Sequence, residues 1–121
     1  MKFKVVGIIP LLFMLGCASS KYTWSGYDDN LYAYYKNPAN NVRFLEKLKE
    51  SVLKADQTGK VPPGLYAEYG YMLYENRNYT DALIYFKKEH ELWPEARFFM
   101  AKMIKNTEDL IAKQQIKETT P

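Results

Sequence analysis

The chain has 121 residues, which is enough for one domain of ordinary size. Hydrophobic residues make up 47% of it, so it can bury a core, and a net charge of +3 is too small to indicate a nucleic-acid-binding protein. A single cysteine excludes an internal disulfide, and a single histidine argues against a histidine-based metal or acid/base site.

Residues 1–16 follow the pattern of a secretory signal. Lys2 and Lys4 precede an apolar run of about 11 residues, which is too short to cross the hydrocarbon core of a bilayer as a helix. Gly16 and Cys17 end the run, and a small residue directly before a cysteine resembles the bacterial lipobox. The resemblance implies a lipoprotein signal peptide that is cut before Cys17, with diacylglycerol joined to the sulfur and an acyl chain such as palmitate on the new amine.

The residues after the cysteine indicate where such a lipoprotein resides. Ala18 and Ser19 stand there instead of aspartate. By resemblance to the sorting rule of enterobacterial lipoproteins, this favours the outer membrane, at its periplasmic face. Several acyl chains hold a protein stably on a membrane, whereas one chain binds marginally. An ordinary secretory signal, or an anchor helix with an incidental cysteine, is the alternative.

A tether is expected to join the signal to the folded part of the chain. Residues 17–30 contain serine, glycine, asparagine and aspartate without a helical period, so we expect a lipidated tether there. Its aromatic residues, which include Tyr22 and Trp24, are expected to dock on the domain, with contact to lipid headgroups as the alternative. The helical domain is expected to cover residues 31–117.

The domain is expected to begin with two helices. Residues 31–36 suit a short helix, and Asn37 followed by Pro38 is typical of the start of another. The apolar residues that follow recur every three or four positions, which predicts an amphipathic helix over 38–55. The expected core face of this helix carries Val42, Leu45, Leu48 and Val52, with Phe44 beside them.

A helical hairpin is predicted next. Glycine and paired prolines at 59–63 predict a loop, after which residues 65–75 suit a helix. Asn78 can cap a second helix, predicted from Tyr79 to Leu92, and Pro94 ends it.

The last predicted helix begins near Glu95. Its expected apolar residues are Ala96, Phe99, Met100, Met103, Ile104, Leu110 and Ile111. Residues 118–121 are expected to fray. Because no segment alternates apolar and polar residues as a half-buried strand does, we predict an all-α fold.

The hairpin resembles one tetratricopeptide (TPR) repeat. With Pro63 as the first position of the roughly 34-residue repeat, the signature positions and the packing of the repeat fall on Tyr66, Tyr69, Gly70, Leu73, Tyr79, Ala82, Phe86 and Pro94. Gly70 and Ala82 lack bulk, so the two helices can approach closely. Glu89 departs from the pattern, because the family has alanine there, and we expect one weaker contact. An unrelated helical hairpin is the alternative.

A single TPR repeat cannot bury both of its own faces. We therefore expect the helix over 38–55 to cover the repeat on one side and the final helix to cap the other. The result is a TPR-like helical hairpin with flanking helices, placed after a signal peptide and a short tether.

The first helix of the hairpin carries a second stripe that is a candidate for partner binding. Its residues and the neighbouring tyrosine cluster are Ala67, Tyr71, Tyr74, Glu75, Tyr32, Tyr34 and Tyr35. In TPR proteins the corresponding positions line a groove that takes peptides, and tyrosine offers a large apolar area with few rotors. The alternative is that the N-terminal helix covers this stripe.

Three stretches resemble a further family when they are taken together: "YTWSGYDDNLYAYYKNPA", "KVPPGLYAEYGYMLYE" and "YFKKEHELWPEARFFM". They resemble a family of short lipoproteins of Gram-negative bacteria that is labelled only as a domain of unknown function. The resemblance covers roughly residues 21–104. Family members tend to be encoded beside lipoproteins similar to the curli export channel, which implies an accessory subunit of an envelope assembly. The resemblance brings no catalytic residues.

The sequence therefore predicts a non-enzymatic protein. No constellation of acid, base and nucleophile is present, and we expect no metal, nucleic acid or small-molecule substrate, and no cofactor beyond the covalent lipid on Cys17. The expected function is a lipid-anchored TPR-like adaptor or accessory subunit of an outer-membrane envelope or secretion assembly, which binds a partner lipoprotein or channel subunit. A periplasmic activator of a cell-wall enzyme and a small enzyme are the alternatives.

Overall fold

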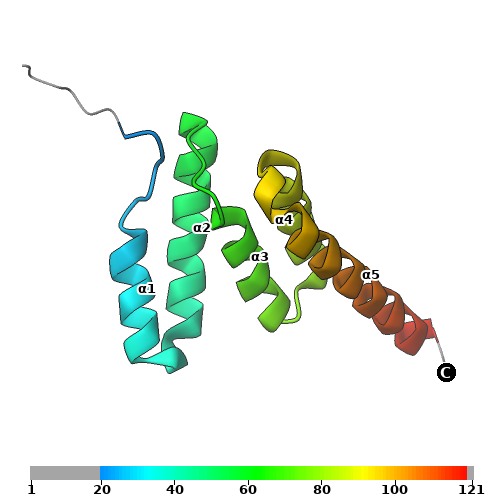
Figure 1. Ribbon diagram of the computed structural model, residues 1–121. Coiled ribbons are helices and arrows are strands. Elements are labelled where there is room, and N and C mark those ends of the chain that lie inside the picture. Colours follow the sequence, from blue (N-terminus) through cyan, green and yellow to red (C-terminus); the bar gives the residue numbers. More distant parts are fainter. Residues whose placement is uncertain (1–19, 120–121) are drawn as a thin grey trace, which may run out of the picture.

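The computed structural model describes residues 20–119, and these contain helices and short turns without a β-strand (Figure 1). The elements are α1 (Tyr27–Lys36), η1 (Pro38–Asn40), α2 (Asn41–Thr58), α3 (Leu65–Glu75), α4 (Tyr79–Leu92), η2 (Pro94–Ala96) and α5 (Arg97–Thr119). The predicted all-α class is confirmed. The predicted signal peptide and the predicted lipid attachment at Cys17 lie outside the described residues. No helix between residues 20 and 119 is long and apolar enough to cross a membrane.

The helices follow one another across the molecule in chain order. Helix α1 packs on α2 and α2 packs on α3, while the most extensive contacts join α3 to α4 and α4 to α5. Figure 1 shows α1, α2 and α3 side by side, with α5 crossing in front of α4 and continuing away from the other helices. The molecule is therefore a row of helices in which α3 stands at the middle.

Helix α1 begins four residues earlier than the expected start at residue 31, so the tether is shorter than predicted. Gly26 precedes the helix with a positive φ of 73°, which glycine adopts without steric cost. Asp28 and Asp29 occupy the first turn, where their negative charges stabilise the positive end of the helix dipole. The tether predicted over residues 17–30 therefore ends at the start of α1.

The buried face of α2 agrees with the prediction at Leu48 and Val52, which are each 1% exposed, and Ala55 extends this face. The prediction is wrong at the start of the helix. There Val42 is 65% exposed, whereas Phe44, which was expected beside the core face, is only 3% exposed. The ring of Phe44 stacks on a tyrosine of α1 at a centroid distance of 4.6 Å, so the contact with α1 occupies the interior at this end of α2.

Helices α3 and α4 have the bounds that the sequence predicted, and they cross closely at Gly70. A Cβ atom added to Gly70 would lie 2.9 Å from the ring of Phe86 and 3.3 Å from the backbone oxygen of Ala82. Phe86 and Ala82 are themselves buried, at 1% and 0% exposed. The missing side chain therefore sets how near the two helices lie.

Helix α3 is also tied to α2 by a polar contact. The hydroxyl of Tyr66 donates a hydrogen bond to the carboxylate of Asp56 near the end of α2. Lys88 of α4 forms an ion pair with the other oxygen of Asp56, with 3.5 Å between nitrogen and oxygen. Asp56 thus connects three consecutive helices at one end of the row.

Glu89 has a structural role that the TPR pattern did not predict. It is 1% exposed, and its two carboxylate oxygens accept hydrogen bonds from the backbone nitrogens of Gly64, at 2.6 Å, and Ala67, at 3.4 Å. These groups belong to the start of α3, where no side chain of the N-cap residue provides a bond. Glu89 therefore caps α3 from the neighbouring helix, in place of the weaker contact that was expected.

The predicted apolar face of α5 is correct in part, because Met100 is buried and Met103 and Ile104 are partly buried against the core. A short 3-10 turn at 94–96 delays the start of this helix to Arg97. Met100 and Thr107 are its buried residues, whereas Phe99, which was predicted to face the core, is 61% exposed. After Thr107 the helix continues to Thr119 with no further buried residue in its described part, so the tail expected to fray from residue 118 is helical over its first two residues.

Removal of the Glu89 carboxylate should destabilise the fold. Glu89→Ala removes the carboxylate that accepts the part-buried hydrogen bonds from the backbone N–H groups of Gly64 and Ala67, and we expect the free energy of unfolding to fall by about 1–3 kcal/mol. Urea denaturation at neutral pH measures this change. Glu91→Ala, at an exposed position of the same helix, is the control and should stay within about 0.5 kcal/mol of the natural chain. Equal stability of the two variants would contradict the capping role.

The same carboxylate should make stability depend on pH. Burial raises the pKa of Glu89 above its usual 4.5, although the backbone N–H groups oppose this shift. The folded chain then binds a proton more tightly than the unfolded chain, so this contribution to stability is complete below pH 4.5 and is lost as pH rises through the folded-state pKa. We expect the free energy of unfolding to rise between neutral pH and pH 4.5, and Glu89→Gln to flatten that rise. An unchanged slope in the variant would contradict the assignment.

Candidate functional site

The exposed face of α3 carries a pair of stacked tyrosines. The rings of Tyr71 and Tyr74 lie 6.5 Å apart between centroids and are inclined by only 14°. Tyr71 is 48% exposed, whereas Tyr74 is half-buried. The ring centroid of Tyr74 lies 5.3 Å from that of Tyr79 and 6.4 Å from that of Phe86. The pair therefore presents one free aromatic ring that rests on a second ring fixed in the core.

A carboxylate accompanies the free ring. The charge of Glu75 and its hydrogen bond to the Tyr71 hydroxyl raise the pKa of that hydroxyl above its usual value. Glu75 is exposed at the end of α3, so the tyrosine pair has an acidic edge.

Two hollows lie along α5, and the one that adjoins α3 is lined by Tyr74 of the tyrosine pair. A hollow of about 220 Å³ is lined by Tyr74, Asn106, Asp109, Leu110 and Lys113. A larger hollow of about 450 Å³ is lined by Arg77, Tyr79, Leu110, Lys113, Gln114, Ile116 and Lys117. Both hollows are lined by Leu110 and Lys113, so they are neighbours between the α3–α4 connection and the second half of α5. We call this region the α3/α5 groove.

The sequence prediction missed the α5 side of this groove. Helix α5 has 23 residues, whereas α4, on which it packs, has 14. Because α5 is longer than α4, its second half is left without cover from α4. The difference in the lengths of the two predicted helices was the signal in the sequence that could have indicated this side of the groove. Leu110, which was predicted as a core residue, is instead half-buried in the floor of the groove.

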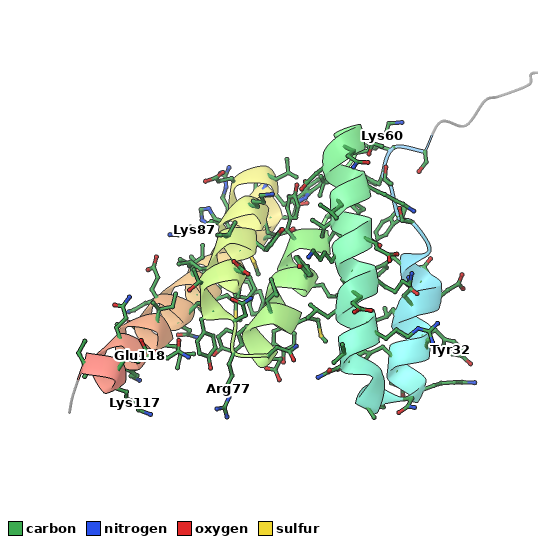
Figure 2. All side chains as sticks on the ribbon, turned by 180° about the vertical axis from the view of Figure 1, so that it is seen from behind. Tyr32, Lys60, Arg77, Lys87, Lys117 and Glu118 are labelled. Carbon is green, nitrogen blue, oxygen red and sulfur yellow. The ribbon has the colours of Figure 1, made fainter. Side chains whose placement is uncertain are left out.

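The structure divides the predicted tyrosine cluster of α1. Tyr34 faces α2 and stacks on Phe44 with an interplanar angle of 9°. Tyr32 and Tyr35 are 60% and 81% exposed and line a separate hollow with Asp28 and Leu31. Figure 2 shows Tyr32 on α1 at the opposite side of the row from the labelled end of α5. The three tyrosines therefore do not form one site.

Helix α1 contacts the candidate stripe at one point. The hydroxyl of Tyr27 donates a hydrogen bond to the carboxylate of Glu68 on α3. Burial raises the pKa of Glu68 above its usual 4.5. Ala67, beside it, is half-buried and packs against the core, whereas Tyr71, further along α3, remains exposed. The part of the stripe that is free for a partner is the part nearest α5.

The segment before α1 is docked on the domain. The backbone nitrogen of Thr23 donates to the backbone oxygen of Lys60 at 2.9 Å, and the hydroxyls of Thr23 and Thr58 lie 2.8 Å apart. The ring of Tyr22 meets that of Trp93 edge to face, with 5.9 Å between centroids. These contacts fix the chain from residue 20 onward at the end of the row that holds the α2–α3 loop.

Outside the groove, the histidine and a lysine of α4 take part in contacts that hold the fold together. The backbone oxygen of His90 accepts a hydrogen bond from Arg97 Nε at 3.2 Å. Lys87 of α4 pairs with Glu108 of α5 at 3.2 Å. No group of three histidine, cysteine, aspartate or glutamate side chains within residues 20–119 is placed to hold a metal ion. The α3/α5 groove thus remains the site with the clearest shape.

Comparison with known proteins gives one match. The family model described as "Domain of unknown function (DUF4810)" matches residues 21–103, which is more than half of the chain. No curated protein and no solved structure matches it significantly.

Proposed function

The chain belongs to the DUF4810 family of domains of unknown function, and we propose that it is a lipid-anchored adaptor at the periplasmic face of the outer membrane. It serves as an accessory subunit of an envelope or secretion assembly and holds a partner lipoprotein or channel subunit in the α3/α5 groove. The observation that carries the proposal is the groove itself, in which a fixed aromatic pair adjoins the uncovered half of a long helix.

We interpret the α3–α4 hairpin as a TPR-like repeat, with the α1–α2 hairpin before it and α5 as its cap. The close crossing at Gly70 supports this interpretation, because the repeat needs two small residues where its helices meet. So does the order of contacts, in which each helix packs on the next. In such an array α1, α3 and α5 line one face, and the Tyr27–Glu68 hydrogen bond and the hollow between α3 and α5 both agree with this arrangement.

The chemistry of the groove suits a peptide segment of a protein partner. Leu110 and the ring of Tyr74 offer apolar contact at its floor, while Asn106, Asp109 and Lys113 offer hydrogen bonds and charges at its edge. An apolar centre with a polar rim is the usual anatomy of a protein interface. Exposed tyrosine commonly contributes a large share of binding energy at such sites.

The anchor part of the proposal rests on residues 1–19, which lie outside the described residues. The supporting pattern is a basic start, a short apolar run and a cysteine at residue 17. The docked segment adds indirect support, because it brings the chain that follows Cys17 to one defined end of the domain. After removal of the signal peptide at 1–16, the lipidated Cys17 and the helical domain together make a small periplasmic module.

Substitution of the free tyrosine should separate binding from folding. We expect Tyr71→Ala to weaken the partner complex by at least about 1 kcal/mol, since it removes the exposed ring of the pair. The readout is recovery of the partner by crosslinking in intact cells, followed by mass spectrometry and by calorimetry with the purified partner. Tyr74→Ala is less suitable, because Tyr74 also packs on Phe86 and its loss destabilises the core.

Tyr35→Ala is the matched control for this experiment. Tyr35 is also an exposed tyrosine, but it lies on the outer side of α1. The complex should survive this change. Loss of the complex with Tyr35→Ala and its survival with Tyr71→Ala would move the site to α1. Recovery of a cell-wall synthase or hydrolase as the groove-dependent partner would favour the activator function over the secretion assembly.

The anchor can be tested independently of the partner. Metabolic labelling with a clickable palmitate should mark the natural chain, because its new amine at Cys17 receives an acyl chain. Cys17→Ser should lose the label and should leave the membrane fraction after cell breakage. A variant that remains as firmly membrane-bound as the natural chain would contradict the lipid anchor.

A further inference from the structure

One end of the molecule exposes large apolar side chains that the core does not use. Phe98 and Phe99, in the first turn of α5, are 77% and 61% exposed. Leu92, the last residue of α4, is 47% exposed, and Trp24, in the docked segment, is 43% exposed. Single exposed apolar residues are ordinary, but several large ones at one end of a small domain need an explanation.

These side chains lie where the chain from Cys17 enters the domain. Tyr22 meets Trp93 at 5.9 Å and Trp24 at 6.4 Å, and Trp93 directly precedes the turn that leads to Phe98. In Figure 1 the N-terminal segment, the end of α2 and the α4–α5 turn all point to the upper end of the molecule. Figure 2 shows Lys60 at this end and Arg77 at the opposite end.

The distance from the proposed anchor is short. Ser20 is three positions after Cys17, and an extended chain spans at most about 3.6 Å per position, so the two lie within about 11 Å of each other. From Ser20 onward the segment is held by the Thr23–Lys60 hydrogen bond and the Tyr22–Trp93 contact. If acyl chains on Cys17 lie in a bilayer, this end of the domain is therefore held against its surface.

We infer that the α4–α5 turn and the docked segment form a membrane-facing surface, with Phe98 and Phe99 inserted into the interfacial layer of the leaflet that holds the Cys17 lipid. This inference rests on the lipid anchor of the proposed function. The occupant of the exposed apolar surface is the lipid bilayer. Tyr22 and Trp24 lie at headgroup level, where amphipathic rings are favoured because one side meets hydrocarbon and the other meets water.

Basic groups lie beside the exposed rings of this end, where the α4–α5 turn also carries the exposed Glu95. Lys102 Nζ lies 4.3 Å from the ring centre of Phe98, and Lys21 Nζ lies 5.3 Å from that of Tyr22. A lysine beside an inserted ring can extend its ammonium group to the phosphates while its stem stays with the apolar layer. Arg97, the first residue of α5, is also exposed and adds a third basic group. The α3/α5 groove, which includes Arg77 at the other end, then faces away from the membrane.

The two tryptophans of the chain provide a probe without added labels. Trp24 and Trp93 both belong to the proposed surface, and the sequence contains only these two. The experiment uses the full lipidated protein, reconstituted into vesicles of phosphatidylethanolamine and phosphatidylglycerol with bromine on the acyl chains. We expect bromine to quench the tryptophan fluorescence. The double substitution Phe98→Ser and Phe99→Ser should lose most of this quenching, while flotation with the vesicles stays unchanged because the lipid anchor remains.

The control is Ile84→Ser, which removes an apolar side chain that is 49% exposed on α4. Its quenching should equal that of the natural chain. Flotation without quenching, or quenching that the double substitution leaves intact, overturns the inference and leaves the anchor standing. If bromine does not quench the natural chain and the double variant loses a bound protein, this end of the domain contacts a protein, and the inference of a membrane-facing surface is overturned. If the Cys17→Ser variant still floats with the vesicles, the lipid anchor of the proposed function is overturned, and the inference of a membrane-facing surface fails with it.

Discussion

The close crossing of α3 and α4 at Gly70 is the constraint on which the rest of the described structure depends. Any side chain at this position would meet the ring of Phe86, so the two helices can approach only because glycine is there. The approach places Glu89 over the start of α3, where it satisfies backbone groups that the N-cap leaves open. It also places the ring of Phe86 against that of Tyr74, so that one ring of the tyrosine pair packs on the core. Packing, capping and the candidate site thus follow from one small residue.

The sequence predicted well where single residues impose local rules. Asparagine at 78 accepts a hydrogen bond from the backbone of Asp81, and proline at 94 stops the helix, so α4 has the predicted bounds. Periodicity alone was less reliable, because it leaves open which of two adjacent stripes is buried. Val42 and Phe99 were expected inside and lie outside, whereas Phe44, beside Val42 in the pattern, packs on α1 and is buried.

The site was harder to predict than the fold, because it depends on distances between helices. The stripe containing Tyr71 could be predicted from spacing on α3, but the second wall of the groove comes from α5, almost 40 positions further along the chain. Tyr34 looked equivalent to Tyr35 in sequence, yet one stacks inside the α1–α2 hairpin and the other is fully outside. Which side of a short helix meets its neighbour is a tertiary property, and the sequence of that helix does not contain it.

We propose a molecule with two functional ends: its docked N-terminal segment lies against the bilayer, and its α3/α5 groove faces the periplasm. Spin labels at Lys60 and at Arg77 of the lipidated protein on vesicles test this orientation most directly, since the two positions lie at opposite ends. The account predicts that a label at 60 is shielded from a water-soluble nickel reagent and reached by oxygen dissolved in the lipid, while a label at 77 shows the reverse. Equal exposure of both labels to the nickel reagent, or shielding at 77 alone, would contradict it.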